Sequence, residues 1–378
     1  ALLFIDSVST KYLYDKYKRS IYGEGENQTF SDNVFNRTFL NYFTLENGIK
    51  DSVELTFKMG NSIIRKKTFR TYPKPKSEKV AETPKITKEQ KEVERKVRIK
   101  QKKYGYSKSS KTYSKDLTFP TNDSTIAVLK VTDFRKGKIR ELYKEVFTDI
   151  KNHKVQNLVL DLRNNGGGYL KDSHYLYAYL VDDSKAFLGE KIVANKTSFG
   201  KSLYNLFPVY SYPLLWLGSG YTYFSTSKNT KDEYELHVPF SHVKIDKDLV
   251  YHHNLYVIIN GGSYSASALI SANLQLKNRA FFVGEETGGD FNGTVAGLMP
   301  KFTLPNSKLK ISVGTVYLSP TEKRDEQAHG VYPNQVIQPN LQDKIKRTDA
   351  ELKWILNDIK KGNIEYNKAL KIENHLPN

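Results

Sequence analysis

The fold is decided by the segment Leu255-Tyr-Val-Ile-Ile-Asn-Gly-Gly-Ser-Tyr-Ser-Ala-Ser-Ala-Leu-Ile270. Its first residues are apolar, β-branched or aromatic, as in a buried strand, and the two glycines after them tolerate backbone angles that other residues resist. Leu269, Ile270 and Leu274 then continue at helical spacing. A serine in the first turn of that helix has its hydroxyl near unpaired backbone N–H groups, which stabilise developing negative charge. The segment therefore indicates a nucleophile on a turn, with simple capping of the helix by these serines as the alternative.

A second segment, Asn157-Leu-Val-Leu-Asp-Leu-Arg-Asn-Asn-Gly-Gly-Gly168, also begins as a buried strand, and a helical pattern follows from Tyr169 to Val181. Three consecutive glycines cost conformational entropy on folding, so they need a reason. One reason is that a substrate approaches the backbone closely and receives hydrogen bonds from its amides, as in an oxyanion hole. We expect Asp161 and Arg163 to pair and to fix the end of the strand. Nucleotide binding is disfavoured, because the spacing matches neither a dinucleotide fingerprint nor a P-loop.

These two segments, with Arg279-Ala-Phe-Phe-Val-Gly-Glu285, resemble the tail-specific or C-terminal processing serine peptidases, which share their core with the Clp and crotonase superfamily. Gly330-Val-Tyr-Pro-Asn334 is similar, more loosely, to the closing turn of that family. Matching the family's serine motif onto Ser263-Tyr-Ser-Ala-Ser267 implies that Ser265, the middle serine, is the nucleophile. The expected oxyanion donors are backbone amides of Gly167 or Gly168 and of Ala266.

The resemblance fails at the general base. The usual tail-specific members carry a lysine 25 residues after the serine, and here that position is Asp290, with Thr294 where those members have glutamine. No lysine occurs between Lys277 and Lys301. The related tricorn-type proteases use a histidine from the first core strand, where this chain has Lys130. Because a serine hydroxyl is a poor nucleophile without a base, the chain must supply another base or be inactive.

Three base candidates follow, each with an ordinary alternative. Lys130 serves only if burial lowers its pKa, and otherwise it is a solvated lysine on an edge strand. His329, with Glu326 near it, precedes the closing turn. A histidine titrates near neutral pH without any perturbation, as a general base requires, and the alternative is that His329 is an ordinary polar loop residue. His174 lies two turns into the helix that follows Gly166-Gly-Gly168, which we call the glycine loop, and we expect its side chain to point away from the oxyanion site. Glu285 and Glu286 end the strand that follows the nucleophile helix, where one of them can orient a base or a substrate amine; a plain strand-end turn is the equal alternative.

Composition indicates a globular protein of more than one unit. The chain has 378 residues, 38% hydrophobic residues, no cysteine and a formal net charge of +18. No apolar run approaches the about 18 residues that span a membrane, and no signal peptide is recognisable. Because the sequence begins inside a strand-like run, we expect that an upstream part of the native protein, with or without an export signal, precedes Ala1. Histidines at metal-ligand spacing are absent from the sequence, and no metal or organic cofactor is expected.

Pattern changes divide the chain into four regions. Residues 1–72 mix a helix with two strands and resemble, weakly, a partial PDZ-like segment. Residues 73–116 form a lysine-rich linker that we expect to be largely solvated, with a capping box that favours a short helix and with contact to anionic surfaces as a secondary possibility. Residues 117–342 are the expected peptidase core, with an aromatic-rich insertion at 185–250 that either overhangs the site or packs as an extra β layer. Residues 343–378 are a final amphipathic helix and tail.

The expected fold class is α/β, with a Clp/crotonase-like core, because strands and helices alternate as they do in parallel βαβ units. The expected elements are strands at 126–132, 158–162, 255–260 and 280–284, and helices at 138–152, 170–181 and 265–276. The resemblance implies a serine endopeptidase that acts on proteins or peptides, in a bacterial periplasm or cell envelope. The rival is a catalytically inactive peptide-binding protein on the same fold. The linker lacks aromatic residues at stacking density, so nucleic acid is not an expected partner.

Overall fold

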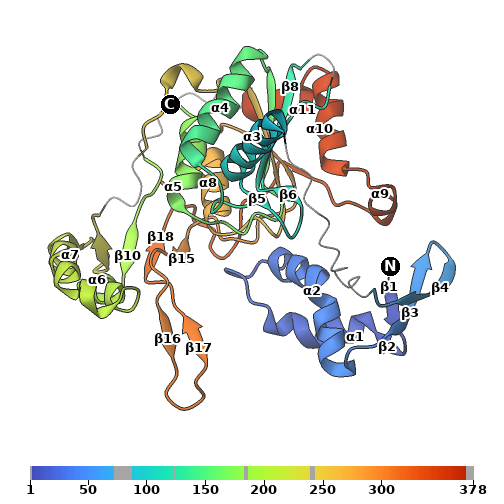
Figure 1. Ribbon diagram of the computed structural model, residues 1–378, viewed down its shortest axis with the longest axis horizontal. Coiled ribbons are helices and arrows are strands. Elements are labelled where there is room, and N and C mark those ends of the chain that lie inside the picture. Colours follow the sequence, from blue (N-terminus) through green and yellow to red (C-terminus); the bar gives the residue numbers. More distant parts are fainter. Residues whose placement is uncertain (1, 72–86, 122–123, 183–185, 239–242, 372–378) are drawn as a thin grey trace.

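The structure is a computed structural model, and it describes residues 2–71, 87–121, 124–182, 186–238 and 243–371 (Figure 1). Its centre is a six-stranded sheet with the strand order β19-β14-β13-β9-β8-β7, in which every neighbouring pair except β7 and β8 is parallel. The bounds are β7 (Lys115–Thr118), β8 (Ile126–Val131), β9 (Asn157–Asp161), β13 (Asn254–Ile259), β14 (Phe281–Gly284) and β19 (Gln335–Val336). The predicted α/β class and its parallel βαβ units are therefore confirmed.

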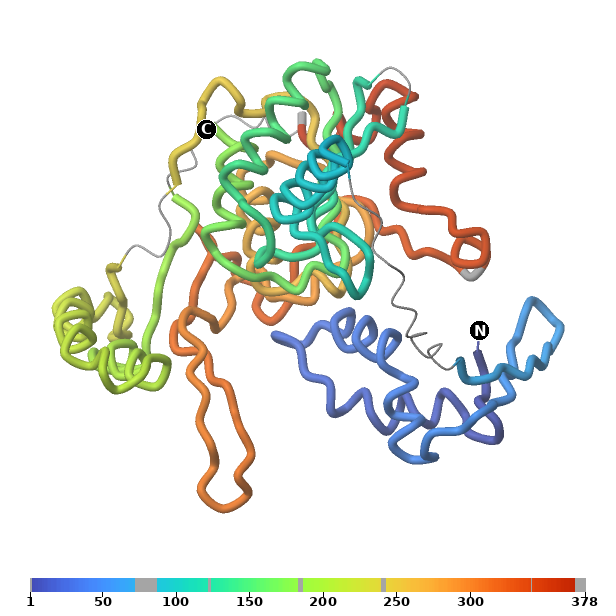
Figure 2. Tube along the Cα trace, viewed as in Figure 1, coloured from blue at the N-terminus to red at the C-terminus, as the bar shows by residue number. Residues whose placement is uncertain are grey.

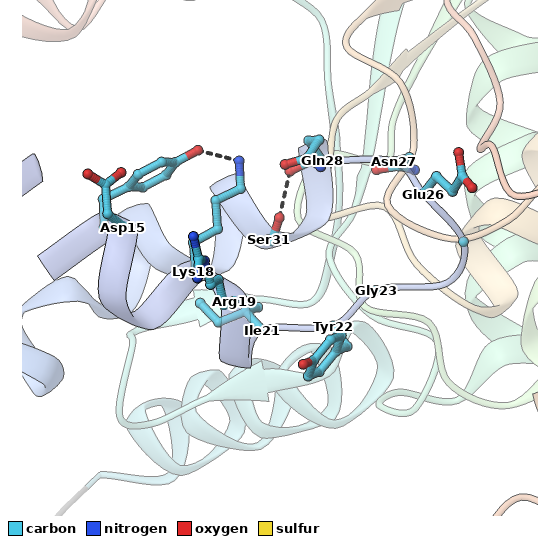
Figure 3. A pocket seen from close by; sticks show the side chains of 12 residues that line it. Asp15, Lys18, Arg19, Ile21, Tyr22, Gly23, Glu26, Asn27, Gln28 and Ser31 are labelled. Atoms are coloured by element: carbon cyan, nitrogen blue, oxygen red, sulfur yellow. Dashed lines mark hydrogen bonds between the residues drawn. The ribbon is translucent and has the colours of Figure 1, made fainter. Parts of the chain in front are cut away.

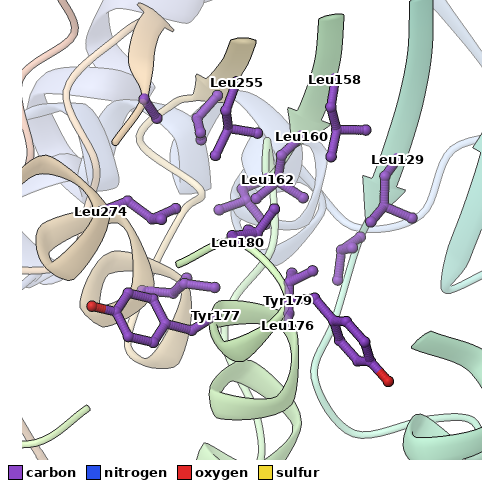
Figure 4. Packing of buried hydrophobic residues seen from close by; sticks show 14 of the residues in the cluster. Leu129, Leu158, Leu160, Leu162, Leu176, Tyr177, Tyr179, Leu180, Leu255 and Leu274 are labelled. Atoms are coloured by element: carbon purple, nitrogen blue, oxygen red, sulfur yellow. The ribbon is translucent and has the colours of Figure 1, made fainter. Parts of the chain in front are cut away.

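Helices cover both faces of this sheet, so its central strands β9, β13 and β14 are largely apolar on both faces rather than alternating. In β13, Leu255, Val257 and Ile259 pack into the larger core, while Tyr256 and Ile258 pack into the smaller core on the other face. The larger core is covered by α4 (Ile139–Asn152), α5 (Leu170–Ala178) and α8 (Ala266–Leu276), and the smaller core by α10 (Ala350–Lys360) and α11 (Ile364–Lys371). Figure 4 shows leucines of the strands meeting the helices in the larger core.

The predicted insertion belongs to a second, five-stranded sheet with the order β11-β12-β10-β18-β15. Its strands are β10 (Lys191–Val193), β11 (Thr226–Lys228), β12 (Tyr234–Leu236), β15 (Thr294–Ala296) and β18 (Val316–Leu318). Two helices, α6 (Ser198–Tyr204) and α7 (Tyr212–Phe224), lie beyond β10 and project away from the core and from α8 (Figure 1). The insertion thus contributes three strands to a second sheet, while most of the aromatic residues expected to overhang the nucleophile lie on α6 and α7, which point away from it in Figure 1.

The N-terminal region contains the predicted helix and strands plus one long helix that the sequence reading missed. The elements are β1 (Leu2–Ile5), β2 (Val8–Ser9), α1 (Thr10–Tyr17), α2 (Thr29–Asn47), β3 (Ser52–Met59) and β4 (Ser62–Phe69). In the linker, the predicted capping box on Thr87 begins a helix, α3 (Lys88–Tyr104), which is longer than expected and ends on the buried Tyr104. The rest of the predicted linker before Thr87 lies outside the described residues. Among the helices of the described ranges, none is long and apolar enough to cross a membrane.

Arg163 ties the end of β9 to the start of α10. Its guanidinium donates to both carboxylate oxygens of Asp161 at 3.0 and 2.8 Å, and to Asp349 at 3.0 and 2.6 Å; Glu351 lies 3.1 Å away. The predicted pairing of Asp161 with Arg163 is confirmed. These carboxylates raise the pKa of Arg163 in spite of its burial.

Replacing Arg163 with alanine is expected to lower the free energy of unfolding by about 3–5 kcal/mol, because buried carboxylates lose their counter-charge. Urea denaturation followed by far-UV circular dichroism measures the loss. Arg37→Ala is the control, since Arg37 is an exposed residue of α2. Equal midpoints for the two variants would contradict a stabilising role for this cluster.

Candidate active site

Ser265 lies at the turn between β13 and α8, where it occupies the N-cap position. Its backbone angles, φ 55° and ψ −123°, fall in a region that non-glycine residues adopt only under constraint, at a cost of about 1–3 kcal/mol. Its side chain makes no capping hydrogen bond, so the capping alternative is wrong for this serine. Ser263 and Ser267 are fully buried, whereas Ser265 is partly exposed. Of the three serines in the motif, Ser265 alone presents its hydroxyl at the surface of the site.

The glycine loop packs directly on this serine. A Cβ atom at Gly167, whose φ is +89°, would lie 2.9 Å from Ser265 Cβ and 2.9 Å from the carbonyl oxygen of Tyr264. Asn165 holds the loop in place: its Oδ1 accepts from Gly167 N–H at 2.9 Å, and its Nδ2 donates to the Val131 carbonyl at 2.9 Å. The two segments that the sequence singled out therefore meet at Ser265.

The predicted oxyanion donors are not equivalent. The amide of Gly167 is already paired with Asn165. The amides of Gly168 and Ala266 have no acceptor within the described parts of the chain. A β-bridge to Phe134 fixes Gly168. The Phe134 N–H donates to the Gly167 carbonyl at 3.0 Å, and the Phe134 carbonyl accepts from the Tyr169 N–H at 2.9 Å. The geometry therefore favours Gly168 over Gly167 as the donor from this loop.

Gly167→Ala is expected to lower peptide hydrolysis by about 100-fold or more, because the added methyl displaces Ser265 or the loop that pairs with it. The measurement is kcat/KM on a fluorogenic peptide. Gly220→Ala is the matched control, since a Cβ at Gly220 meets no atom within 4 Å. Hydrolysis by Gly167→Ala at the control rate would show that the close packing of the loop is irrelevant to activity.

His329 lies against the same loop that borders Ser265. This loop runs from Glu286 to Phe291. The N–H of Gly289 donates to the Ser263 carbonyl at 3.2 Å, and a Cβ atom added at Gly289 would lie 3.0 Å from the backbone nitrogen of Ser265. Phe291 N–H donates to the His329 carbonyl at 2.8 Å. One short segment thus connects the nucleophile turn to the histidine.

Glu286 is the carboxylate that orients this histidine. Its Oε1 lies 3.2 Å from His329 Nδ1 and accepts from Gly330 N–H at 2.7 Å. A proton on Nδ1 leaves Nε2 as a bare acceptor, which is the form a general base requires. The carboxylate expected near His329 was Glu326, but that residue is paired with Arg324 at 3.2 Å and with the Tyr332 hydroxyl at 3.0 Å. Glu286, named only as a candidate for orienting a base, takes that position.

The other two base candidates lie elsewhere. In β8, Lys130 lies between Leu129 and Val131, whose side chains pack into the larger core beneath α8. Because successive side chains of a strand point to opposite faces, Lys130 points to the other face of the sheet. There its side chain is 53% exposed and lies 3.7 Å from Asp161. The ring of His174 is buried and stacks on Phe187 at 4.8 Å, in agreement with the expectation that it points away from the oxyanion site.

Glu24 is a carboxylate of this region that the sequence reading missed. Its Oε2 accepts from Asp290 N–H at 3.1 Å, and its Oε1 accepts from the Thr294 hydroxyl. The Tyr264 hydroxyl also hydrogen-bonds to it, and burial raises the pKa of Glu24. Glu24 therefore hydrogen-bonds to both Asp290 and Thr294, the positions where the usual tail-specific members carry lysine and glutamine. No local pattern marks it, because it lies in an N-terminal loop far from Ser265 in the sequence.

Residues near Glu24 in the N-terminal region donate hydrogen bonds to backbone carbonyls of the loop beside Ser265. Asn27 Nδ2 donates to the Thr287 carbonyl at 2.6 Å, and the Thr29 hydroxyl donates to the Glu286 carbonyl at 3.1 Å. Phe30 packs on Tyr264 with ring centroids 4.7 Å apart. Figure 3 shows a cleft beside these N-terminal residues, but all of its lining residues belong to the N-terminal region. The residues near Glu24 thus support the candidate site, while the cleft is separate from it.

Comparisons with known proteins identify the family of the chain and support its fold. The family model of peptidase family S41 matches residues 125–337, which include the glycine loop, Ser265 and His329. Among solved structures, mature CPAF is similar with a TM-score of 0.55 and 14% identity, over 97% of this chain and 77% of that one, both alone and in complex with lactacystin. A putative peptidase from Parabacteroides merdae ATCC 43184 matches with a TM-score of 0.40 and 13% identity, over 93% of this chain and 89% of that one. No curated protein matches significantly in sequence. Within the described residues, no cluster of three potential metal ligands occurs.

Proposed function

Because the chain belongs to peptidase family S41, it is a serine-type peptidase acting on proteins or peptides, and we propose that Ser265 is its nucleophile. The observation that carries this proposal is the constrained, uncapped conformation of Ser265 against the glycine loop. A residue that served only to begin a helix would have no need of this strain. The absence of lysine at position 290 is compatible with activity, since another residue supplies the base.

The proposed reaction uses three groups of this chain. His329 Nε2 accepts the proton of the Ser265 hydroxyl as the oxygen attacks the substrate carbonyl, and later donates it to the leaving amine. Glu286 holds the imidazole through Nδ1 and stabilises its charged form. The amides of Gly168 and Ala266 receive the negative charge that develops on the carbonyl oxygen, and each such donor contributes about 3 kcal/mol to transition-state stabilisation. Water then cleaves the acyl-enzyme by the same steps.

Finer aspects of the activity are part of the proposal. Cleavage within chains entered from their C-termini, the tail-specific mode, is supported by the sequence resemblance alone, as is a periplasmic or other extracytoplasmic location. Incubation with an unfolded protein substrate, followed by mass spectrometry of the products, tests this mode. Substrates whose C-terminal carboxylate is free are expected to be cleaved faster than amidated ones, and equal rates would overturn the tail-specific mode while leaving the peptidase activity intact.

The rival proposal, an inactive peptide-binding protein, has little to support it. The one observation in its favour was the missing lysine, and His329 with Glu286 offers a replacement. Binding of a peptide by the wild-type protein with no turnover, in the same incubation, would restore the rival.

Glu24→Gln is expected to lower kcat about tenfold with little change in KM, because a charged acceptor for Asp290 N–H is lost and the loop between Ser265 and His329 is less well held. Steady-state kinetics on a fluorogenic peptide separates the two constants. Glu26→Gln is the control, since Glu26 is an exposed glutamate of the same loop. A change confined to KM, or equal kcat in both variants, would show that Glu24 does not position the site.

A further inference from the structure

The helix α7 exposes an unusual amount of apolar surface. Its thirteen residues carry no charged side chain, and Thr222 is its single buried residue. Trp216 is 70% exposed and Phe224 is 87% exposed. The other exposed large apolar residues of α7 and of the turn before it are Leu206, Phe207, Val209, Tyr210, Leu214, Leu217, Tyr221 and Tyr223. We call residues 198–224, which comprise α6, this turn and α7, the aromatic arm.

A second projecting element has the same character. The hairpin formed by β16 (Lys301–Thr303) and β17 (Lys310–Ser312) extends from β15 and β18, and we call residues 299–313 the basic hairpin. Its exposed apolar residues are Met299, Phe302, Leu304, Leu309, Ile311 and Val313. The arm follows β10, and β10 pairs with β18, so both elements arise from neighbouring strands of one sheet. Figures 1 and 2 show the two projecting on the same side of the molecule, away from the central sheet.

The charge of both elements has one sign. Residues 191–231, which contain the aromatic arm, include five lysines and no acidic residue. Two of these lysines are paired with flanking carboxylates, Lys228 with Asp232 at 2.5 Å and Lys231 with Glu190 at 3.8 Å. Residues 291–321, which contain the basic hairpin, include three lysines and no acidic residue. Lys196 Nζ lies 5.1 Å from the ring centroid of Tyr223, which places a cation beside the aromatic side chains. Apolar and aromatic tips with lysines beside them match the chemistry of an anionic membrane interface.

We propose that the aromatic arm and the basic hairpin together bind the surface of an anionic lipid bilayer. Trp216 and its apolar neighbours enter the boundary between headgroups and acyl chains, and the lysines face the anionic headgroups. A second copy of this chain fits less well. A two-fold interface through the basic hairpin would set Lys301, Lys308 and Lys310 of the two copies opposite one another, with no acidic residue between positions 291 and 321 to neutralise them. This surface is distinct from the lysine-rich linker, whose helix α3 lies in another part of the molecule (Figure 1).

Vesicle binding by the full chain tests the proposal. The wild-type protein is expected to co-sediment with vesicles of phosphatidylglycerol and phosphatidylcholine, and only weakly with phosphatidylcholine alone. The double variant Trp216→Ser, Phe224→Ser is expected to reduce the partition coefficient by about tenfold or more, because two large side chains no longer enter the interface. Each lysine changed to glutamine in the basic hairpin is expected to reduce it about fivefold at low salt. The control is Leu45→Ser, Ile49→Ser, since these residues are exposed apolar positions of the N-terminal region.

Tryptophan fluorescence gives a second readout that does not depend on the folding of the double variant. The chain has two tryptophans, and Trp354 packs on Phe281 with ring centroids 5.7 Å apart. In Trp354→Phe, emission from Trp216 is expected to shift to shorter wavelength when anionic vesicles are added. An unshifted emission would overturn the proposal. Vesicle binding that survives in the arm variant but is lost when lysines of α3 are changed would also overturn it. So would an arm variant that loses self-association in sedimentation velocity while its vesicle binding is unchanged.

Discussion

Replacing Ser265 with alanine is expected to lower kcat for peptide hydrolysis by about 10⁴- to 10⁶-fold, because no other group in the site can form the acyl-enzyme. The residual rate comes from the oxyanion donors and substrate binding, which the substitution leaves in place. Stability is expected to change little, since the Ser265 side chain makes no capping bond and is partly exposed. Steady-state hydrolysis and thermal unfolding, measured on the same preparations, separate loss of chemistry from loss of fold.

Ser271→Ala is the matched control for this experiment. Ser271 lies in the same helix, α8, and its hydroxyl donates to the Ser267 carbonyl at 2.8 Å. Its removal is expected to leave most of the activity intact. If Ser265→Ala kept wild-type activity, the nucleophile would have to be another residue, and the functional account of the turn after β13 would be wrong.

The second large effect is expected at His329. Changing it to alanine is expected to lower kcat by about 10²- to 10⁴-fold, the usual contribution of a general base. Glu286→Gln is expected to have a smaller effect, about tenfold, because the histidine remains but loses the partner at 3.2 Å that fixes its tautomer. Partial rescue of His329→Ala by added imidazole would distinguish lost chemistry from a displaced loop.

Lys130→Met provides the opposing prediction. Because the side chain of Lys130 lies on the far side of the sheet from α8, its replacement is expected to leave kcat unchanged. Loss of activity in Lys130→Met together with retention in His329→Ala would reverse the assignment of the base.

The core of the fold could be predicted from local sequence patterns. Buried strands followed by glycines and helical spacing are local signals, and the predicted bounds of β13 and α8 differ from the observed ones by one residue. The nucleophile turn and the glycine loop were recognisable for the same reason: Gly167 and Ser265 each sit at a strand-to-helix turn. Such features depend on the backbone of a few consecutive residues.

The rest of the site depends on contacts between distant segments, which no local pattern encodes. Glu24 reaches Asp290 and Thr294 from an N-terminal loop whose residues show no motif. The face of Lys130 was ambiguous, since the other five residues of β8 are apolar and buried on both faces, so they show no alternation with polar residues. Likewise, Glu326 lies near His329 in the sequence and Glu286 lies 43 residues away, yet Glu286 meets His329, because the bridge between Asp290 and Gly330 brings the two loops together.

The position of the aromatic insertion was also beyond sequence reasoning. A run of tyrosine, phenylalanine and tryptophan is as compatible with a substrate cleft as with a buried layer, and α7 turned out to be neither. Its direction is set by the pairing of β10 with β12 and β18, which are far apart in the chain. Long-range strand pairing of this kind fixes where an insertion points, and composition does not.

The most direct test of the central claim is reaction of the full chain with a fluorophosphonate probe, followed by peptide mapping of the adduct by mass spectrometry. An activated serine reacts with such a probe, whereas a serine that only begins a helix does not. The account predicts a single adduct on Ser265, absent from Ser265→Ala and slowed in His329→Ala. A folded wild-type protein without any adduct, or with an adduct on a different serine, would contradict it.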